Sequence, residues 1–171
     1  NCGHSIDYSL TTPWLKNYKR NPYPHTFLWE DYPMDGQRRL GFYNLHVLQR
    51  PKAADGLKDT SGEDRDYYEM DIKDNVIRLS VKKVTYQTVE RDPVYGIDLK
   101  FAKSYHPTSG GKWKIYLNDQ LVDMNKPITI FINDRKVFEG KIVPRMEDMI
   151  TSCMEYFDPC RVFPASVDVA L

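Results

Sequence analysis

The side chains of this 171-residue chain that are best suited to chemistry are its four histidines. They are His4, His25, His46 and His106. An imidazole acts as a general base only when a nucleophile and an orienting carboxylate lie within hydrogen-bonding reach. Three of the four stand in a strand pattern or beside a proline, so we predict structural or exposed roles for them. His4, in the pair Gly3-His4, remains the candidate catalytic residue.

No sequence motif supplies the partners that His4 would need. The chain has no Gly-x-Ser-x-Gly elbow, no His-Glu-x-x-His helix, no Gly-rich phosphate loop and no dinucleotide fingerprint. The acidic pairs Glu63-Asp64 and Glu147-Asp148 fall in a polar loop and in the first turn of a predicted helix, where carboxylates complement the helix dipole. We therefore expect the chain to be non-catalytic by itself and to bind no cofactor.

The three cysteines, Cys2, Cys153 and Cys160, fit no zinc-binding spacing, so we expect no metal site. Cys153 lies on a predicted apolar stripe, where a free thiol packs as a small hydrophobic residue. A bridge to Cys160, beyond a proline break, is the alternative that the spacing allows. Cys2 with His4 would make a nucleophile pair only if neighbouring residues oriented it, and the sequence shows none.

Aromatic residues are the remaining candidates for ligand binding. The chain has 12 Tyr, 7 Phe and 3 Trp, a balance that favours β-structure. Trp29, Tyr43, Tyr67 and Tyr116 could together form a stacking surface for sugar rings. Trp113 could join them, but it alternates with Ile115 and Leu117 and is better explained as a core residue.

The overall charge excludes two classes of partner. Lys and Arg number 24, as do Asp and Glu, so no net field draws the chain to nucleic acid or to an anionic membrane. No apolar run approaches the roughly 20 residues of a membrane helix. We expect neither nucleic-acid binding nor a membrane span.

Period-two alternation predicts eight or nine strands. Two hairpins are expected over residues 68–82, turning at Asp74-Asn75, and over residues 128–143, turning at Asn133-Asp134. Further strands are predicted over residues 25–29, 40–48, 95–101, 112–117 and 161–171. In the third of these, Tyr95, Ile97, Leu99 and Phe101 share one half-buried face. Pro164 places the last strand at a sheet edge or at a bulge.

Helical periodicity is confined to two segments. Residues 145–157 follow Pro144 and carry an apolar stripe that we expect to pack on the sheet, namely Met146, Met149, Ile150, Cys153 and Phe157. Residues 12–18 could form a short helix capped by Thr12, with Trp14 and Leu15 buried. Residues 49–66 have no periodicity and are predicted to form a surface loop. The fold class is therefore mainly β, a β-sandwich of immunoglobulin-like or jelly-roll-like type over residues 25–171, with one or two short helices.

Three stretches resemble a known family. "WLKNYKRNPYPHTFLW", "LVDMNKPITIFINDRKVFEGKIVPRMEDMI" and "DPCRVFPASVDV" are similar to the junction, hairpin with short helix, and final strand that follow the catalytic domain in bacterial secreted α/β-hydrolases of the esterase and prolyl-oligopeptidase-like group. The chain departs from that pattern at Asp134, where glycine is usual, and in the long loop over residues 49–66. In that group a Gly-His pair before the Trp-Leu helix carries the catalytic imidazole, and Gly3-His4 stands in that place.

The resemblance implies an accessory domain of an extracytoplasmic serine hydrolase. Residues 1–24 would then be an arm and junction, at the end of a hydrolase domain that precedes Asn1. The expected partner is that catalytic domain, in cis or in trans, and the expected location is the periplasm, the cell surface or the exterior. The competing hypothesis is a stand-alone carbohydrate-binding module that uses the aromatic residues named above.

Overall fold

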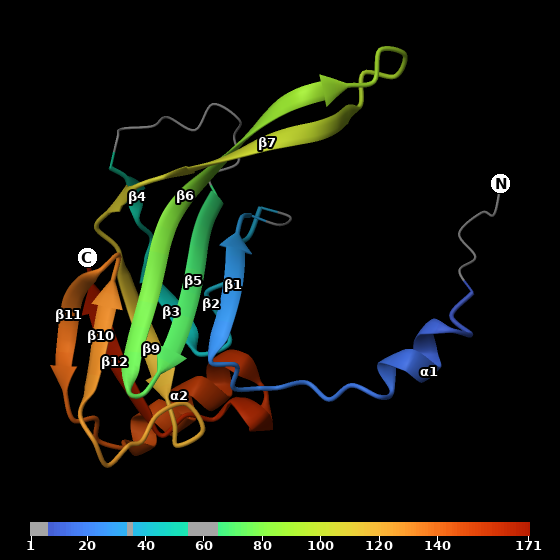
Figure 1. The fold of residues 1–171 in the computed structure, drawn as a ribbon. Helices are drawn as coiled ribbons and strands as arrows, with labels where there is room; N and C mark the ends of the chain where they lie inside the picture. Colours follow the sequence, from blue (N-terminus) through green and yellow to red (C-terminus); the bar gives the residue numbers. More distant parts are fainter. Residues whose placement is uncertain (1–6, 34–35, 55–64) are drawn as a thin grey trace.

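Two hydrogen-bonded sheets face each other in a computed structural model of the chain, which describes residues 7–33, 36–54 and 65–171 (Figure 1). The larger sheet has the strand order β1-β5-β6-β10-β11, with β7 also paired to β6. The smaller sheet has the order β12-β9-β3-β2, and β4 pairs with β8. The bounds in the larger sheet are β1 Thr26–Asp31, β5 Arg65–Lys73, β6 Val76–Arg91, β7 Asp98–His106, β10 Ile128–Ile132 and β11 Arg135–Gly140. The remaining strands are β2 Gly41–Phe42, β3 Leu45–Gln49, β4 Lys52–Ala53, β8 Thr108–Ser109, β9 Lys112–Leu117 and β12 Ala165–Ala170.

The core lies between the inner faces of these two sheets. Ile77, Leu79 and Val81 alternate inward along β6, and Trp113, Ile115 and Leu117 do so along β9. Each inward side chain is removed from water by the opposite sheet, which is the main stabilising contribution in a sandwich. The predicted mainly β, sandwich-like fold is confirmed, and so is the predicted core position of Trp113.

Both predicted hairpins are present, with the predicted turns. Asp74 and Asn75 have φ of 49° and 62°, and Asn133 and Asp134 have φ of 47° and 65°. Asn and Asp accept this left-handed conformation better than other residues with a side chain, and it matches the twist of the paired strands. β10 runs parallel to β6, with Ile130 beside Ile77, so the larger sheet is mixed.

The last strand lies at an edge, one of the two positions predicted for it, but it begins at Ala165, so Pro164 precedes it and does not interrupt it. β12 pairs only with β9, and its apolar side chains Ala165, Val167 and Val169 are buried. Phe163, just before the strand, is also fully buried and stacks on Tyr116 at a ring-centroid distance of 5.5 Å.

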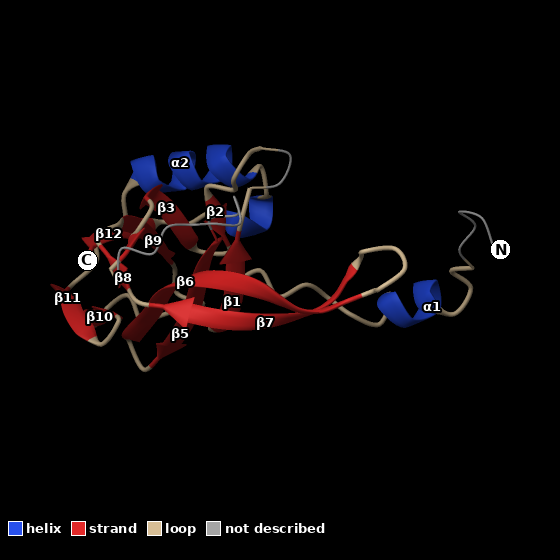
Figure 2. Cartoon of the chain, turned by 90° about the horizontal axis from the view of Figure 1, so that it is seen from above, coloured by secondary structure: helices blue, strands red, loops and turns tan. Residues whose placement is uncertain are grey.

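The half-buried face predicted for residues 95–101 is wrong. β6 is sixteen residues long and runs beyond the sandwich with β7, so the two strands form a projecting hairpin (Figures 1 and 2). Among the described residues, no second sheet covers this part of the hairpin. Tyr95, Ile97, Leu99 and Phe101 are therefore exposed, and Tyr95 at the tip is 79% exposed.

The predicted N-terminal helix forms, but its burial was predicted wrongly. α1 spans Thr11–Leu15 and buries none of its residues, so Trp14 and Leu15 are exposed. Its N-cap is Leu10, not Thr12, and no side chain caps it. The segment extends away from both sheets (Figure 1), and Trp14 has only its neighbour Tyr18 as an aromatic contact among the described residues.

The second helix also forms, but in the opposite phase. α2 spans Met146–Tyr156, and a 3-10 helix over Pro159–Arg161 follows it. The buried positions are Asp148 and Ser152, whereas Phe157 is 89% exposed and the apolar stripe with Met146, Met149 and Ile150 faces outward. Cys153 and Cys160 are exposed free thiols, so Cys153 neither packs in the core nor bridges to Cys160.

Buried hydrogen bonds explain the phase of α2. The Asp148 carboxylate accepts hydrogen bonds from Arg145 Nε at 2.9 Å and from Ser166 Oγ at 2.7 Å. Ser152 Oγ accepts from the Phe163 backbone N–H at 2.9 Å. If the apolar stripe faced inward instead, Asp148 and Ser152 would turn toward water, and the buried Phe163 backbone N–H would lose its hydrogen-bond partner.

Candidate functional site

The most distinctive surface is the side of the larger sheet that faces away from the smaller one, here called the outer face. Alternate residues of each strand point to it, which brings together cross-strand neighbours such as Glu30 and Tyr67, and Tyr67 and Lys82. Tyr105 of β7 reaches the same face through its pairing with Val84. The outer face thus carries tyrosines interleaved with charged residues.

Glu30 is the centre of the polar contacts on this face. Its carboxylate accepts hydrogen bonds from Tyr86 Oη at 2.8 Å, from Lys103 Nζ at 2.6 Å and from Arg65 Nη1 at 3.2 Å. Burial raises the pKa of the Glu30 carboxyl, but the hydrogen bonds from Lys103 and Tyr86 outweigh it and hold the pKa below its usual value. Glu30 is therefore ionised at neutral pH and fixes two cations in place.

Tyrosine rings surround these cations. The Arg65 guanidinium lies 4.4 Å from the ring centre of Tyr32, and Lys103 Nζ lies 5.1 Å from that of Tyr105. Tyr67 and Tyr105 meet edge to face at 5.1 Å. Cation–π and edge-to-face contacts hold such rings in fixed orientations.

A groove of about 590 Å³ continues from this cluster along the outer face. We call it the outer-face groove and define it by Glu69, Asp71, Arg78, Lys82, Tyr105 and Phe131. Lys82 Nζ lies 5.4 Å from the Tyr105 ring centre, and the Arg78 guanidinium lies 4.6 Å from that of Phe131. The groove therefore contains two aromatic rings, those of Tyr105 and Phe131, with ionised side chains between them.

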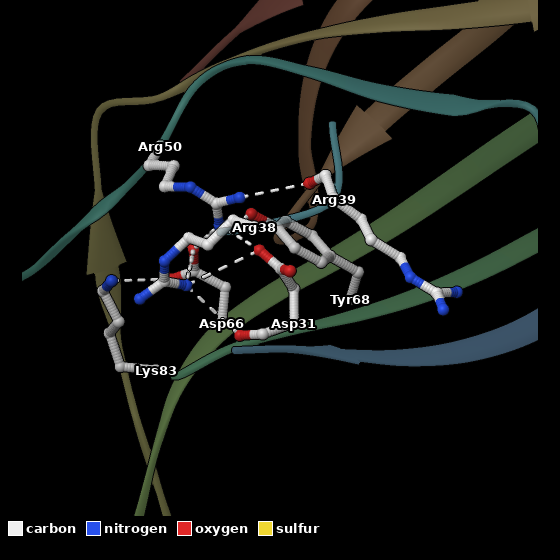
Figure 3. A network of polar contacts seen from close by, with 7 residues as sticks. All are labelled: Asp31, Arg38, Arg39, Arg50, Asp66, Tyr68 and Lys83. Atoms are coloured by element: carbon white, nitrogen blue, oxygen red, sulfur yellow. Dashed lines mark hydrogen bonds and ion pairs between the residues drawn. The ribbon is translucent and has the colours of Figure 1, made fainter. Parts of the chain in front are cut away.

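A second polar cluster is buried and joins the two sheets (Figure 3). Arg50, which follows β3 of the smaller sheet, donates hydrogen bonds to Asp31 and to Asp66 of the larger sheet. Lys83 Nζ donates to Asp66 at 2.6 Å, and Tyr68 Oη donates to it at 3.3 Å. Burial raises the pKa of Asp31 more than Arg50 lowers it. Because these charged groups pair with one another inside the protein, we interpret the role of this cluster as structural: it links the two sheets.

The sequence-predicted sugar platform is not formed by the four residues proposed for it. Trp29 and Tyr116 are buried in the core, and Tyr43 is half-buried against Phe27. Only Tyr67 lies on the outer face. Trp29 points inward on β1 and stacks on Phe42 of the smaller sheet. Tyr116 points to the other face of β9, where Phe163 and the α2 residues Glu155 and Tyr156 cover it.

The described histidines each have a polar partner. His25 Nε2 lies 2.8 Å from the Gln120 carbonyl oxygen, and His46 Nδ1 lies 3.2 Å from Glu155 Oε2. His106 Nε2 lies 2.9 Å from Thr85 Oγ1. His4 and Cys2 lie outside the described residues. Within the described ranges, no group of three His, Cys, Asp or Glu side chains could hold a metal ion.

The sequence reasoning missed Tyr105, Phe131 and the outer-face groove. The available signal was the alternation itself: Phe131 is the outward position between Ile130 and Ile132, and Tyr105 follows Lys103 at a two-residue interval. What it could not show is that their strands lie next to β6.

Comparison with protein-family models, with curated proteins and with solved structures finds no match. No helix among the described residues has the length and apolarity to cross a membrane.

Proposed function

We propose that this chain is a non-catalytic accessory domain of an extracytoplasmic α/β-type serine hydrolase, and that it packs on the catalytic domain. One observation carries the proposal. The N-terminal segment with Trp14 and Leu15, and the β6–β7 hairpin tip with Val94 and Tyr95, project to the same side of the sandwich in both views (Figures 1 and 2). Two apolar projections on one side favour a single folded partner.

Leaving such side chains in water is unfavourable. Burying apolar surface contributes about 25 cal/mol per Å², and contiguous exposed apolar groups usually mark an interface. The exposed residues of the two projections include Trp14 and Tyr95, and tryptophan and tyrosine are enriched at protein interfaces. A partner that contacts both projections would remove their apolar groups from water.

The resemblance supplies the identity of the partner. The N-terminal projection contains the segment that resembles the junction after a hydrolase domain, so the catalytic domain is the partner that this hypothesis expects. The extracytoplasmic location belongs to the same proposal and rests on the same resemblance.

Site-specific photocrosslinking tests the proposal. A benzoyl-phenylalanine is placed at Trp14 or at Tyr95 in the native reading frame, and crosslinked peptides are identified by mass spectrometry. We expect both positions to crosslink to one hydrolase domain that carries a Gly-x-Ser-x-Gly motif. Val143, which is equally exposed but lies next to α2, serves as the matched control.

Two results would contradict the proposal. One is crosslinking at Trp14 and Tyr95 that does not exceed the Val143 control or reaches unrelated proteins. The other is esterase activity of the isolated chain toward p-nitrophenyl esters that disappears in His4→Ala, which would make the chain an enzyme by itself.

A further inference from the structure

We infer that the outer-face groove is a binding site for a neutral oligosaccharide. The inference is independent of the accessory role, because the groove lies on the sheet and uses neither the N-terminal segment nor the hairpin tip. It also differs from the platform expected from the sequence, since it shares none of the four residues proposed there.

Two aromatic rings provide the stacking surfaces. Tyr105 is 48% exposed, and its edge-to-face contact with Tyr67 at 5.1 Å fixes its orientation. A sugar that stacks on this ring displaces the flexible Lys82 ammonium group, which lies 5.4 Å from the ring centre. Phe131 is half-buried on β10 and lines the same groove. The C–H-bearing face of a pyranose packs on such rings in the way that other apolar surfaces do.

The groups between the rings match the hydroxyls of a sugar. Asp71 stands opposite Arg78 in the β5–β6 register, and Glu69 stands opposite Ser80. A carboxylate accepts hydrogen bonds from neighbouring hydroxyls, and a guanidinium donates several in a fixed plane. A sugar hydroxyl both donates and accepts, so it can pair with either kind of group.

The mixture of charges selects a neutral ligand. An anionic ligand would meet the carboxylates of Glu69 and Asp71, and a cationic ligand would meet Arg78 and Lys82. A wholly apolar ligand would cover these ionised groups without giving them partners, which is costly. A chain of neutral hydroxylated rings avoids all three penalties.

The groove is also of suitable size and rigidity. Its volume of about 590 Å³ falls within the roughly 300–1,000 Å³ of small-molecule sites. The Asn133 side chain, at one wall, accepts a hydrogen bond from the Val81 backbone N–H at 2.7 Å and donates to the Val81 carbonyl at 3.1 Å. Groups held on paired strands lose little freedom on binding, so the site is preorganised.

Isothermal titration with defined hexasaccharides tests the inference. The probes are cellohexaose, xylohexaose, mannohexaose, maltohexaose and laminarihexaose, added to the full chain. We expect at least one to bind, and we expect Tyr105→Ala to weaken that binding by about tenfold, which corresponds to the loss of one aromatic stacking contact. Tyr95→Ala, on the same hairpin but outside the groove, is the matched control and should bind as the native chain does.

A second variant separates recognition from folding. Asp71→Asn keeps the shape of the side chain but weakens its acceptor strength, and we expect it to reduce affinity while the circular dichroism spectrum stays unchanged. The inference is wrong if none of the five hexasaccharides binds, if binding survives Tyr105→Ala, or if Tyr95→Ala weakens it equally. Binding that is lost when salt rises from about 50 to 500 mM would also refute it, because a neutral ligand is insensitive to charge screening.

Discussion

Replacing Asp66 by Asn should cause a large loss of stability, although it alters only one polar group. Asp66 is fully buried, and its carboxylate oxygens lie 2.6 Å from Lys83 Nζ and 2.7 Å from Arg50 Nη1. Arg38 lies 3.9 Å away. The cluster of Figure 3 balances these three cations against the carboxylates of Asp66 and Asp31, so removing one carboxylate leaves three cations facing a single anion.

The expected decrease in the free energy of unfolding follows from the burial of the cations. The Lys83 side chain is almost completely buried and lies against the Asp66 carboxylate. Breaking a buried pair by removing one partner costs about 3 to 5 kcal/mol, because the other charge stays desolvated. Total domain stabilities are about 5–15 kcal/mol, so the expected loss is a large fraction of the whole.

Urea unfolding at pH 7, followed by circular dichroism, measures the free energy of unfolding. Asp168→Asn is the matched control, because Asp168 pairs with Lys114 at 3.1 Å but is largely exposed, and it should cost under about 1 kcal/mol. Adding Lys83→Met to Asp66→Asn should recover part of the loss, since it removes the buried cation that has lost the Asp66 carboxylate. A loss below about 1 kcal/mol in Asp66→Asn would refute the reasoning and mean that the cluster is hydrated.

Two further predictions concern α2 and the outer face. Phe157→Gly should raise the free energy of unfolding by up to about 1 kcal/mol, because Phe157 is exposed and ends α2 at φ 47°, where glycine is favoured; a loss of about 3 kcal/mol in urea unfolding would show that Phe157 is buried, as the periodicity predicted. Glu30→Gln should lower the free energy of unfolding by about 1 kcal/mol at pH 7. The folded-state pKa of Glu30 lies below the unfolded value of about 4.3, so its stabilisation is present above that pH and is lost as the pH falls through the folded pKa. The difference from the native chain should therefore shrink in acid, and a difference that stays constant down to the lowest measurable pH would contradict the role of its charge.

Local sequence patterns were sufficient to predict the structural features that depend only on residues close together in the chain. The turns at Asp74-Asn75 and Asn133-Asp134 need only residues that tolerate positive φ between two alternating strands, and both form as predicted. Pro164 predicts that the last strand lies at an edge or at a bulge; β12 lies at an edge, but it begins at Ala165, directly after the proline. The inward positions of Trp113, Ile115 and Leu117 also follow from period-two alternation, since a sheet covered on one face buries alternate residues.

The sequence could not predict the burial of side chains where that burial depends on another strand or helix packing against them. Alternation over Tyr95 to Phe101 gives a strand with an apolar face, but it does not say whether another sheet covers that face. None of the sheets in the described part of the chain does so. The same holds for α2: its periodicity marks an apolar stripe, whereas its orientation is decided by hydrogen bonds that Asp148 and Ser152 make with residues beyond the helix.

The candidate site shows the same division. The sequence alone named Tyr67 as one of four candidate stacking residues, and of the four only Tyr67 lies on the outer face. Only the tertiary structure placed β10 and β7 one after the other along the same edge of β6, opposite β5, which brings Phe131 and Tyr105 to one groove. It also placed Trp29 under the opposite sheet, and Tyr116 under α2 and Phe163. Strand order and sheet packing join residues far apart in the chain through the burial of apolar surface, and no local pattern encodes which partner provides that burial.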